Sequence, residues 1–450
     1  MAARKRTSST SGGAEVPTAR GVATAVIARV HKDDAWAAAV LDGELERSVQ
    51  LDARERALAT ELVFGTLRHQ GFLLSALAAN APRGLDKLDP WTRAAMLVAA
   101  HQLVFLDRVP SFAAVNEAVG AIRRARGAGL AGFANAVLRK VASQAAGLAA
   151  ARDSAPFTSL APWLREGLVR ALGEDGARAL VRVDGAPPTG LRVRATEDRD
   201  AWGERLANAR PAATVERGDV SPLAILVRGA GKLAELPGYG AAWTVQEEGS
   251  QVIALALGAR PGDVVLDACA GRGHKTAVLA EAVGPRGAVD AADLHASKLD
   301  VLRAHLAELG LAPRAVAEVD LSVGLGSLRG PYDRALVDAP CTGTGTLRRR
   351  PELALRKKAT DPARMAAMGR TILARVASAV RPGGRVVYSV CSVLREEAED
   401  AIVRPEELGL RPAPFDADVM RGLAGEATAV RLLPHLHGTD GYFIASFERV

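Results

Sequence analysis

Val264-Val-Leu-Asp-Ala-Cys-Ala-Gly-Arg-Gly-His-Lys275 is the stretch that says most about the fold of this 450-residue chain. A short apolar strand ends at Asp267, a loop containing Gly271 and Gly273 follows, and a helix is expected from Lys275 onward. A glycine turn of this kind lets backbone N–H groups approach a nucleotide-like ligand closely. An ordinary strand-to-helix turn is the alternative.

Two common nucleotide loops do not fit this stretch. It is not G-x-G-x-x-G, because residue 276 is Thr, and it is not a Walker A loop, since Cys269 and His274 stand where glycine is needed. A nicotinamide dehydrogenase is therefore disfavoured. The leading expectation is a nucleoside cofactor derived from methionine.

The residues after 245 repeat the pattern of short strand and longer helix. Strands are expected at 264–267, 288–293, 315–320, 334–338 and 385–389, and helices at 275–283, 296–309 and 362–380. Repeated strand–helix units predict a Rossmann-like, doubly wound parallel sheet. Ligands of such sheets bind beyond the carboxyl ends of the strands.

The rest of the chain divides by pattern. Residues 1–16 have the composition of a disordered tail, and 17–150 show helical periodicity without a convincing strand. Residues 151–240 mix one helix with strand-like stretches, which suggests a small α/β connector, and 241–450 form the expected α/β domain. The prediction is thus a multidomain protein with an all-α N-terminal domain.

Composition restricts the setting and the partners. A net charge of +7 and a pI near 9.6 suit a polyanionic partner such as RNA. Three widely spaced cysteines without C-x-x-C argue against a disulfide scaffold and against a zinc or other metal site. The chain shows neither an apolar leader nor a membrane-spanning stretch. We expect a monomeric cytoplasmic protein that does not bind a membrane.

Acidic residues end three further strands. Asp293 lies about 20 residues after the glycine loop, where a carboxylate can accept hydrogen bonds from ribose hydroxyls. Asp320 is placed for an adenine amine, and Asp338 opens Asp338-Ala-Pro-Cys-Thr-Gly-Thr-Gly345. Each alone is more often a helix cap or a loop residue. Their recurrence at successive strand ends favours a cofactor site.

The cysteines give the second chemical signal. Cys341 and Cys391 both follow expected strands, and a thiol near a helix start can have a lowered pKa. Carbon 5 of cytosine is a poor nucleophile, but addition of a thiolate at carbon 6 makes the ring an enamine that can accept a methyl group. A base must then remove the proton at carbon 5. Buried, inert cysteines are the alternative, and spacing does not say which thiol would attack.

Several motifs resemble one family of enzymes. The motifs are Asp338-Ala-Pro-Cys-Thr-Gly-Thr-Gly345, Tyr388-Ser-Val-Cys-Ser-Val-Leu394, Val245-Gln-Glu-Glu-Gly-Ser-Gln251 and Asp440-Gly-Tyr-Phe443. They are similar to motifs of the Fmu/Sun RNA cytosine-C5 methyltransferases. Stretches such as Glu61-Leu-Val-Phe-Gly-Thr-Leu-Arg68 and Gly132-Phe-Ala-Asn-Ala-Val-Leu-Arg139 resemble the NusB-like RNA-binding domain of the branch that modifies 16S ribosomal RNA.

This resemblance implies S-adenosylmethionine as cofactor and 16S ribosomal RNA, or a small-subunit assembly intermediate, as partner. It makes Cys391 the nucleophile and Cys341 the residue that assists product release, with Asp338 close to both the base and the cofactor. The other implied cofactor contacts are Ala268, Cys269, Ala270, Gly271, Arg272, Gly273, His274, Lys275, Asp293 and Asp320.

The chain departs from the family pattern in the glycine loop and just before the nucleophile. The family loop usually reads Cys-Ala-Ala-Pro-Gly-Gly-Lys, whereas this chain has Arg272 in place of Pro and His274 in place of the second Gly; Val390 replaces a Thr before the nucleophile. A side chain at 274 is expected to crowd the approach of the backbone to a ligand unless Gly271 compensates. A non-catalytic RNA-binding assembly factor with a degenerate cofactor loop is thus the alternative function.

Overall fold

The computed structural model describes residues 17–82, 84–182 and 185–450. The predicted tail over 1–16 lies outside them. By its internal contacts the chain divides into two compact units, the first ending at Ser159 and the second beginning at Leu160, and each is described by itself. The finer boundaries at 150 and 240 stay predictions.

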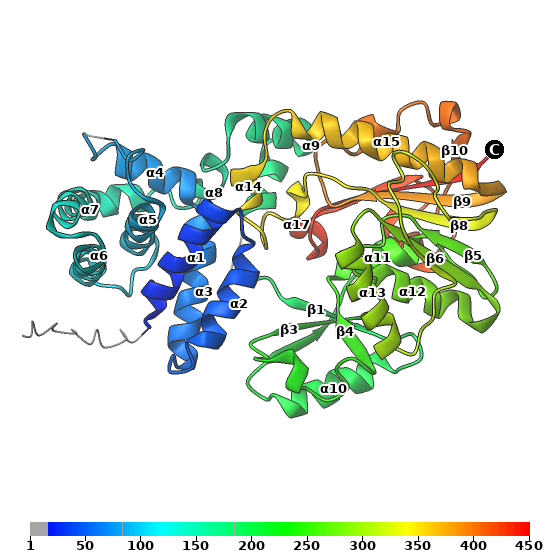
Figure 1. Ribbon diagram of the computed structural model, residues 1–450, viewed down its shortest axis with the longest axis horizontal. Helices are drawn as coiled ribbons and strands as arrows, with labels where there is room; N and C mark the ends of the chain where they lie inside the picture. The colour runs from blue at the N-terminus through cyan, green and yellow to red at the C-terminus, as the bar shows by residue number, and fades with distance from the viewer. Residues whose placement is uncertain (1–16, 83, 183–184) are drawn as a thin grey trace, which may run out of the picture. The chain divides into compact units, whose positions relative to one another are not determined.

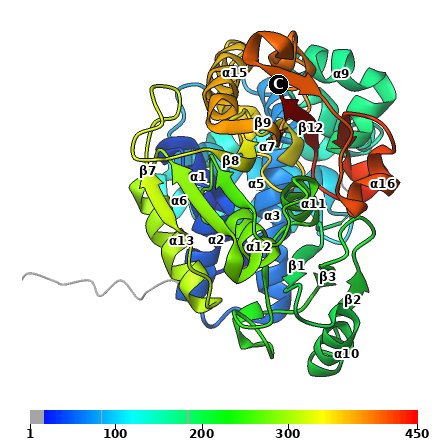
Figure 2. The same ribbon diagram turned by 90° about the vertical axis from the view of Figure 1, so that its right-hand side faces the viewer.

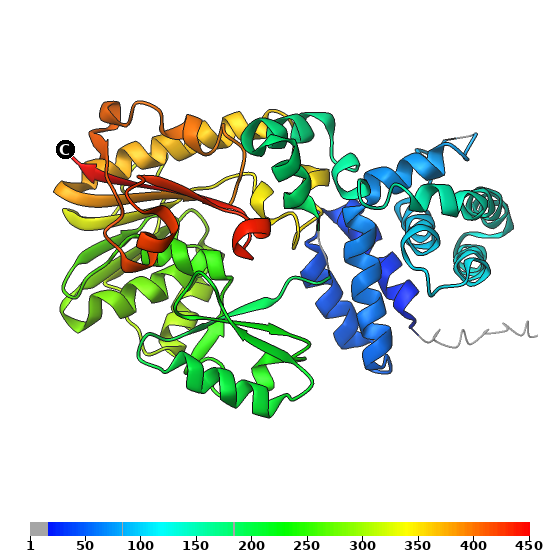
Figure 3. The ribbon, with the colours of Figure 1, turned by 180° about the vertical axis from the view of Figure 1, so that it is seen from behind.

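The first unit is helical (Figure 3). Its helices are α1 (Ala19–Asp33), α2 (Ala37–Arg47), α3 (Ala53–Arg68), α4 (Gln70–Ala78), α5 (Pro90–Phe105), α6 (Ser111–Arg126), α7 (Ala128–Ala149) and α8 (Ala155–Thr158). Asp89 caps α5 by accepting a hydrogen bond from the backbone N–H of Thr92 at 3.2 Å, and Pro90 is its first residue. Helix α5 is buried on almost every side, so it forms the centre of this all-α unit.

The second unit begins with α9 (Pro162–Val181) and a small antiparallel sheet. The strands are β1 (Thr189–Val193), β2 (Thr214–Arg217), β3 (Ala224–Arg228) and β4 (Trp243–Val245), in the order β2-β3-β1-β4. Helix α10 (Arg199–Ala209) packs against β2 and β3 (Figure 2). Fully buried Trp243 lies in the apolar core of this layer.

The larger sheet of this unit is mixed and mostly parallel. Its strands are β5 (Val264–Asp267), β6 (Ala288–Asp293), β7 (Ala315–Glu318), β8 (Tyr332–Asp338), β9 (Val380–Val390), β10 (Leu410–Pro412), β11 (Ala429–Leu432) and β12 (Tyr442–Arg449). The order is β10-β12-β9-β8-β5-β6-β7, with β11 on β12. Strands β5 to β9 pair in parallel and confirm the predicted fold class, whereas β10, β11 and β12 pair antiparallel.

Helices cover both faces of this sheet (Figure 1). Helices α12 (His274–Val283) and α13 (Ala296–Glu308) pack on β5, β6 and β7, and α15 (Asp361–Ala379) packs on β8 and β9 across the sheet. The remaining helices are α11 (Glu248–Ala256), α14 (Leu353–Arg356), α16 (Asp418–Ala424) and α17 (Pro434–His437). Within the described ranges, no helix has the length and apolarity that a bilayer crossing requires.

The strand order defines where a ligand can bind. From β5 the chain moves outward to β6 and β7 on one side, and then returns to β8 and β9 on the other. The carboxyl ends of β5 and β8 therefore flank a topological switch point, where sheets of this type hold their ligands.

Candidate active site

Two cysteines meet at the carboxyl ends of neighbouring strands. Cys341 lies three residues beyond the end of β8, and Cys391 directly follows β9. Their Sγ atoms are 3.3 Å apart. The parallel register of β8 and β9, which sets Asp338 opposite Ser389, brings the two loops to the same edge.

Asp338 connects the cysteine loops to the glycine loop. Its Oδ2 lies 2.6 Å from Nζ of Lys275, and its Oδ1 accepts a hydrogen bond from Ser389 Oγ at 2.8 Å. Burial opposes the charge of Lys275, but the charge and hydrogen bond of Asp338 outweigh it and raise the pKa of the lysine. The pair therefore places a fixed cation and anion beside the thiols.

The glycine loop has the backbone that its sequence predicts. Gly271 and Gly273 have positive φ of 55° and 86°, a region that favours glycine. A Cβ on Gly273 would lie 2.8 Å from a side-chain carbon of Leu302, so this position has no room for a larger residue. Ala270 N–H donates to the carbonyl of Ala292 at 2.8 Å, which fixes the loop on the end of β6.

Asp293 closes the same loop. Its Oδ2 accepts from the backbone N–H of Gly271 at 3.0 Å, and its Oδ1 accepts from the N–H of His295 at 2.9 Å. Lys298 lies 3.4 Å from Oδ1. Asp293 therefore holds the glycine loop through a hydrogen bond to the backbone of Gly271, and its contact with a cofactor stays a prediction.

His274 does not extend over the loop. Its ring packs against His305 of α13, with centroids 4.8 Å apart, and burial lowers the pKa of His274 to about 4. A neutral imidazole between two helices thus fills the position where the family has glycine. The neighbouring Arg272 is exposed.

Three other predicted residues have no hydrogen bond to the thiol pair in the described structure. Burial raises the pKa of Cys269, so this thiol stays protonated; it packs against the sheet core. Ala268, next to it, is buried and its N–H donates to the carbonyl of Leu336 at 2.9 Å. Asp320 is exposed, and both hydrogen bonds found for its carboxylate come from Ser322. Neither links it to the glycine loop.

Sequence reasoning missed two buried carboxylates. Asp267, with no exposed surface, accepts from Thr276 Oγ1 at 2.7 Å through Oδ2, while Oδ1 has no hydrogen-bond partner in the described part of the chain. Burial raises the pKa of Asp267 to about 6. The second is Glu397, on the segment after Cys391. A charged residue that ends or follows a buried strand was the available signal for both.

Two arginines that follow Cys341 in the chain, Arg348 and Arg349, form ion pairs within the protein. Arg348 Nε lies 2.6 Å from Asp440 Oδ1, and Arg349 Nε lies 3.0 Å from the same atom. Asp440 N–H in turn donates to Glu247 at 2.9 Å. Asp440 therefore pairs with both arginines in this structure.

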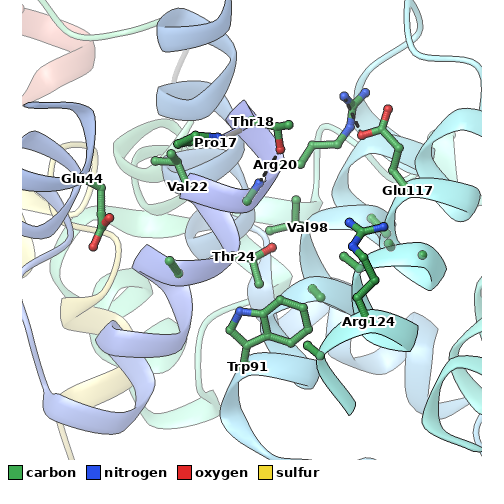
Figure 4. A pocket seen from close by; sticks show the side chains of 18 of the residues that line it. Pro17, Thr18, Arg20, Val22, Thr24, Glu44, Trp91, Val98, Glu117 and Arg124 are labelled. Carbon is green, nitrogen blue, oxygen red and sulfur yellow. Dashed lines mark hydrogen bonds and ion pairs between the residues drawn. The ribbon is translucent and has the colours of Figure 1, made fainter. Parts of the chain in front are cut away.

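A pocket of about 740 Å³ lies in the helical unit, apart from these residues (Figure 4). Helices α1, α5 and α6 line it. Arg20 points across it to Glu117 at 3.0 Å and also donates to Gln102 at 2.6 Å. None of the predicted site residues lines this pocket. Among the described residues, no cluster of His, Cys, Asp or Glu could hold a metal ion.

The parallel sheet with a glycine turn and acidic strand ends is the fold of a methyltransferase domain. Residues 254–448 match the family model described as 16S rRNA methyltransferase RsmB/F, and residues 17–143 match the NusB family. Together with the near full-length relatives described next, these matches show that the chain belongs to the RsmB/F family of 16S rRNA methyltransferases, with a NusB N-terminal region.

Relatives match almost the whole chain. "Probable ribosomal RNA small subunit methyltransferase B" of Bacillus subtilis is 31% identical, over 96% of this chain and 98% of its own. "Ribosomal RNA small subunit methyltransferase B" of Pseudomonas syringae pv. tomato is 32% identical, over 92% and 95%. Among solved structures, that of PH0851 has a TM-score of 0.79 at 22% identity, covering 97% of this chain and 99% of that one. The last similarity concerns the fold alone.

Proposed function

We propose that the protein transfers a methyl group from S-adenosylmethionine to carbon 5 of a cytosine in 16S rRNA, through a transient bond between Cys391 and carbon 6. The observation that carries the proposal is the 3.3 Å distance between the Sγ atoms of Cys341 and Cys391. Inert core cysteines have no need to meet at strand ends beside a Lys275–Asp338 pair.

The roles of the two thiols follow the resemblance and are supported by the local electrostatics. The hydrogen bond with Cys391 and burial raise the pKa of Cys341, which keeps Cys341 protonated. A protonated Cys341 can donate its S–H to a Cys391 thiolate. The ammonium of Lys275 interacts electrostatically with Cys391.

The residues around the glycine loop fit the proposed cofactor. The loop backbone is open where Gly271 has nothing within 4 Å of an added Cβ, so a ligand can approach closely. The buried Oδ1 of Asp267 lacks a partner among the described residues, and an amine of the cofactor would satisfy it. Asp293 and Lys275 would complete the site. The solved structure titled "NSun6 from Pyrococcus horikoshii with SFG" shares this fold, with a TM-score of 0.56 at 19% identity over 64% of this chain and 98% of that one.

The steps on the base use residues of this chain. Cys391 Sγ bonds to carbon 6 while Asp338 orients the ring edge, which makes carbon 5 nucleophilic. When bound, S-adenosylmethionine supplies the methyl group that carbon 5 takes up. The Cys341 thiol gives its proton to the leaving Sγ of Cys391, and the resulting Cys341 thiolate takes the proton from carbon 5. The electrons of the carbon 5–hydrogen bond restore the ring double bond as the Sγ–carbon 6 bond breaks.

Comparison of two single variants tests which cysteine attacks the base and which assists release. With unmodified 16S rRNA and S-adenosylmethionine, Cys341→Ala should accumulate a protein–RNA adduct that survives denaturing electrophoresis, because attack proceeds and release does not. Cys391→Ala should form none. The double variant is the control and should resemble Cys391→Ala. Mass spectrometry of the RNA measures 5-methylcytosine, and its absence with wild-type protein would rule the proposal out.

A further inference from the structure

One buried carboxylate connects the two loops that carry the cysteines. Oε1 of Glu397 accepts a hydrogen bond from the backbone N–H of Thr342 at 2.6 Å. Oε2 accepts from Thr342 Oγ1 at 2.5 Å and from Ser392 Oγ at 2.5 Å. Thr342 directly follows Cys341, and Ser392 directly follows Cys391. Glu397 therefore bonds to the residue next to each thiol, alongside two direct links between the loops, Thr344 Oγ1 to Ser392 Oγ at 2.9 Å and Gly345 N–H to the Cys391 carbonyl at 3.0 Å.

The carboxylate of Glu397 is bound firmly in the interior. Only 1% of the residue is exposed, and burial raises the pKa of Glu397 in spite of its three hydrogen bonds. A buried acid is costly unless hydrogen bonds replace its hydration. Its own backbone is held as well, because Tyr388 Oη donates to the Glu397 carbonyl at 2.8 Å. The segment after Cys391 is therefore a rigid base for the bridge.

The two loops depend on this bridge to different degrees. Cys391 extends from β9, which pairs with β8 on one side and β12 on the other. Cys341 lies in a loop that contains Gly343, at φ 76°, and the side chain of Glu397 binds this loop at Thr342. Loss of the bridge should therefore displace Cys341 more than Cys391.

We propose that Glu397 is a positioning residue that holds Cys341 beside Cys391 for release of the methylated base. This inference rests on the proposed function. Glu397 acts through Thr342 and Ser392 and does not itself touch the reacting atoms. The bridge requires a side chain long enough to accept hydrogen bonds from both Thr342 and Ser392, and this reach matters more than the negative charge.

Three substitutions at this position separate length from charge. Glu397→Ala removes the bridge, so turnover should fall by roughly 100-fold, and the covalent adduct should accumulate as it does in Cys341→Ala. Glu397→Gln keeps the length and can still accept from the N–H of Thr342, so it should restore most of the turnover. Glu397→Asp keeps the charge but is one methylene too short, so it should resemble the Ala variant. The KM for S-adenosylmethionine should stay near that of the wild type in all three.

Glu396→Gln is the matched control. Glu396 precedes the bridge residue and pairs with Arg170 of α9 at 2.8 Å, and no hydrogen bond found for it reaches a cysteine loop in the described structure. It should turn over like wild type. Turnover, adduct and thermal midpoint are measured for every variant with an unmodified 16S rRNA transcript. If Glu397→Ala fails to fold, Thr342→Val and Ser392→Ala each remove one hydroxyl of the bridge and should each accumulate adduct.

The outcomes separate this inference from the function on which it rests. Absence of 5-methylcytosine with wild-type protein would remove both. Normal wild-type chemistry together with normal release in Glu397→Ala, or in both hydroxyl variants, would overturn the inference alone. An active Asp variant beside an inactive Gln variant would also overturn it, because charge rather than reach would then be the requirement.

Discussion

We expect the affinity for the cofactor to depend on pH through ionisation of the buried carboxylate of Asp267. Its pKa is raised from 3.8 to about 6 by burial, and its Oδ1 has no partner in the described structure. If Oδ1 accepts a hydrogen bond from the cofactor's ammonium group, only the ionised acid binds well. At pH 5 about one molecule in eleven is ionised, and at pH 7 nearly all are. Affinity should therefore be roughly tenfold weaker at pH 5 than at pH 7.

The ionisation of Asp267 affects folding stability in the opposite direction: cofactor affinity should rise with pH, whereas the stability of the cofactor-free protein should fall. A folded pKa above the unfolded value means that folding disfavours the ionised acid, so this group lowers the stability of the cofactor-free protein as pH rises from about 4 to about 6. A shift of about two units corresponds to a cost on the order of 3 kcal/mol. The cofactor should remove part of this cost by pairing with the charge.

Calorimetric titration with S-adenosylmethionine between pH 5 and pH 8 measures the effect. Asp267→Asn cannot ionise, so its affinity should be weaker at neutral pH and nearly independent of pH in this range. Thermal midpoints recorded at each pH check that the variant is folded. A wild-type affinity that is equal at pH 5 and pH 7, or an Asn variant that keeps the tenfold change, would show that Asp267 does not hold the cofactor.

Three further substitutions test other parts of the site. Gly273→Ala combines a positive φ with a contact to Leu302, so the free energy of unfolding should fall by about 1–3 kcal/mol in denaturant titration and cofactor binding should weaken; unchanged values of both would contradict the loop geometry. Lys275→Met leaves Asp338 without its cation, so the initial rate of methyl transfer should fall at least tenfold. Retention of the full rate would show that the Lys275–Asp338 pair is not needed for methyl transfer. Asp440→Asn removes the carboxylate charge that Arg348 and Arg349 share, so the thermal midpoint should drop by a few degrees. An unchanged midpoint would show that this ion-pair network is dispensable.

Much of the sheet was predictable because its strands are short, apolar and followed by glycine or acid. The observed bounds of β5 and β6 coincide with the predicted ones. Strands β2, β4, β10, β11 and β12 were not predicted. They pair antiparallel and lack the strand–helix alternation that identified the others, so only their partners define them.

The sequence by itself determined which residues end β5, β6 and β8, where glycine turns occur and which chemistry three isolated cysteines suggest. These are properties of neighbours along the chain. The tertiary structure alone decided that Cys341 and Cys391 touch while Cys269 does not, that Asp320 stays exposed, and that Glu397 bridges two loops. Each of these depends on strand register and on contacts between residues far apart in sequence, which local pattern does not encode.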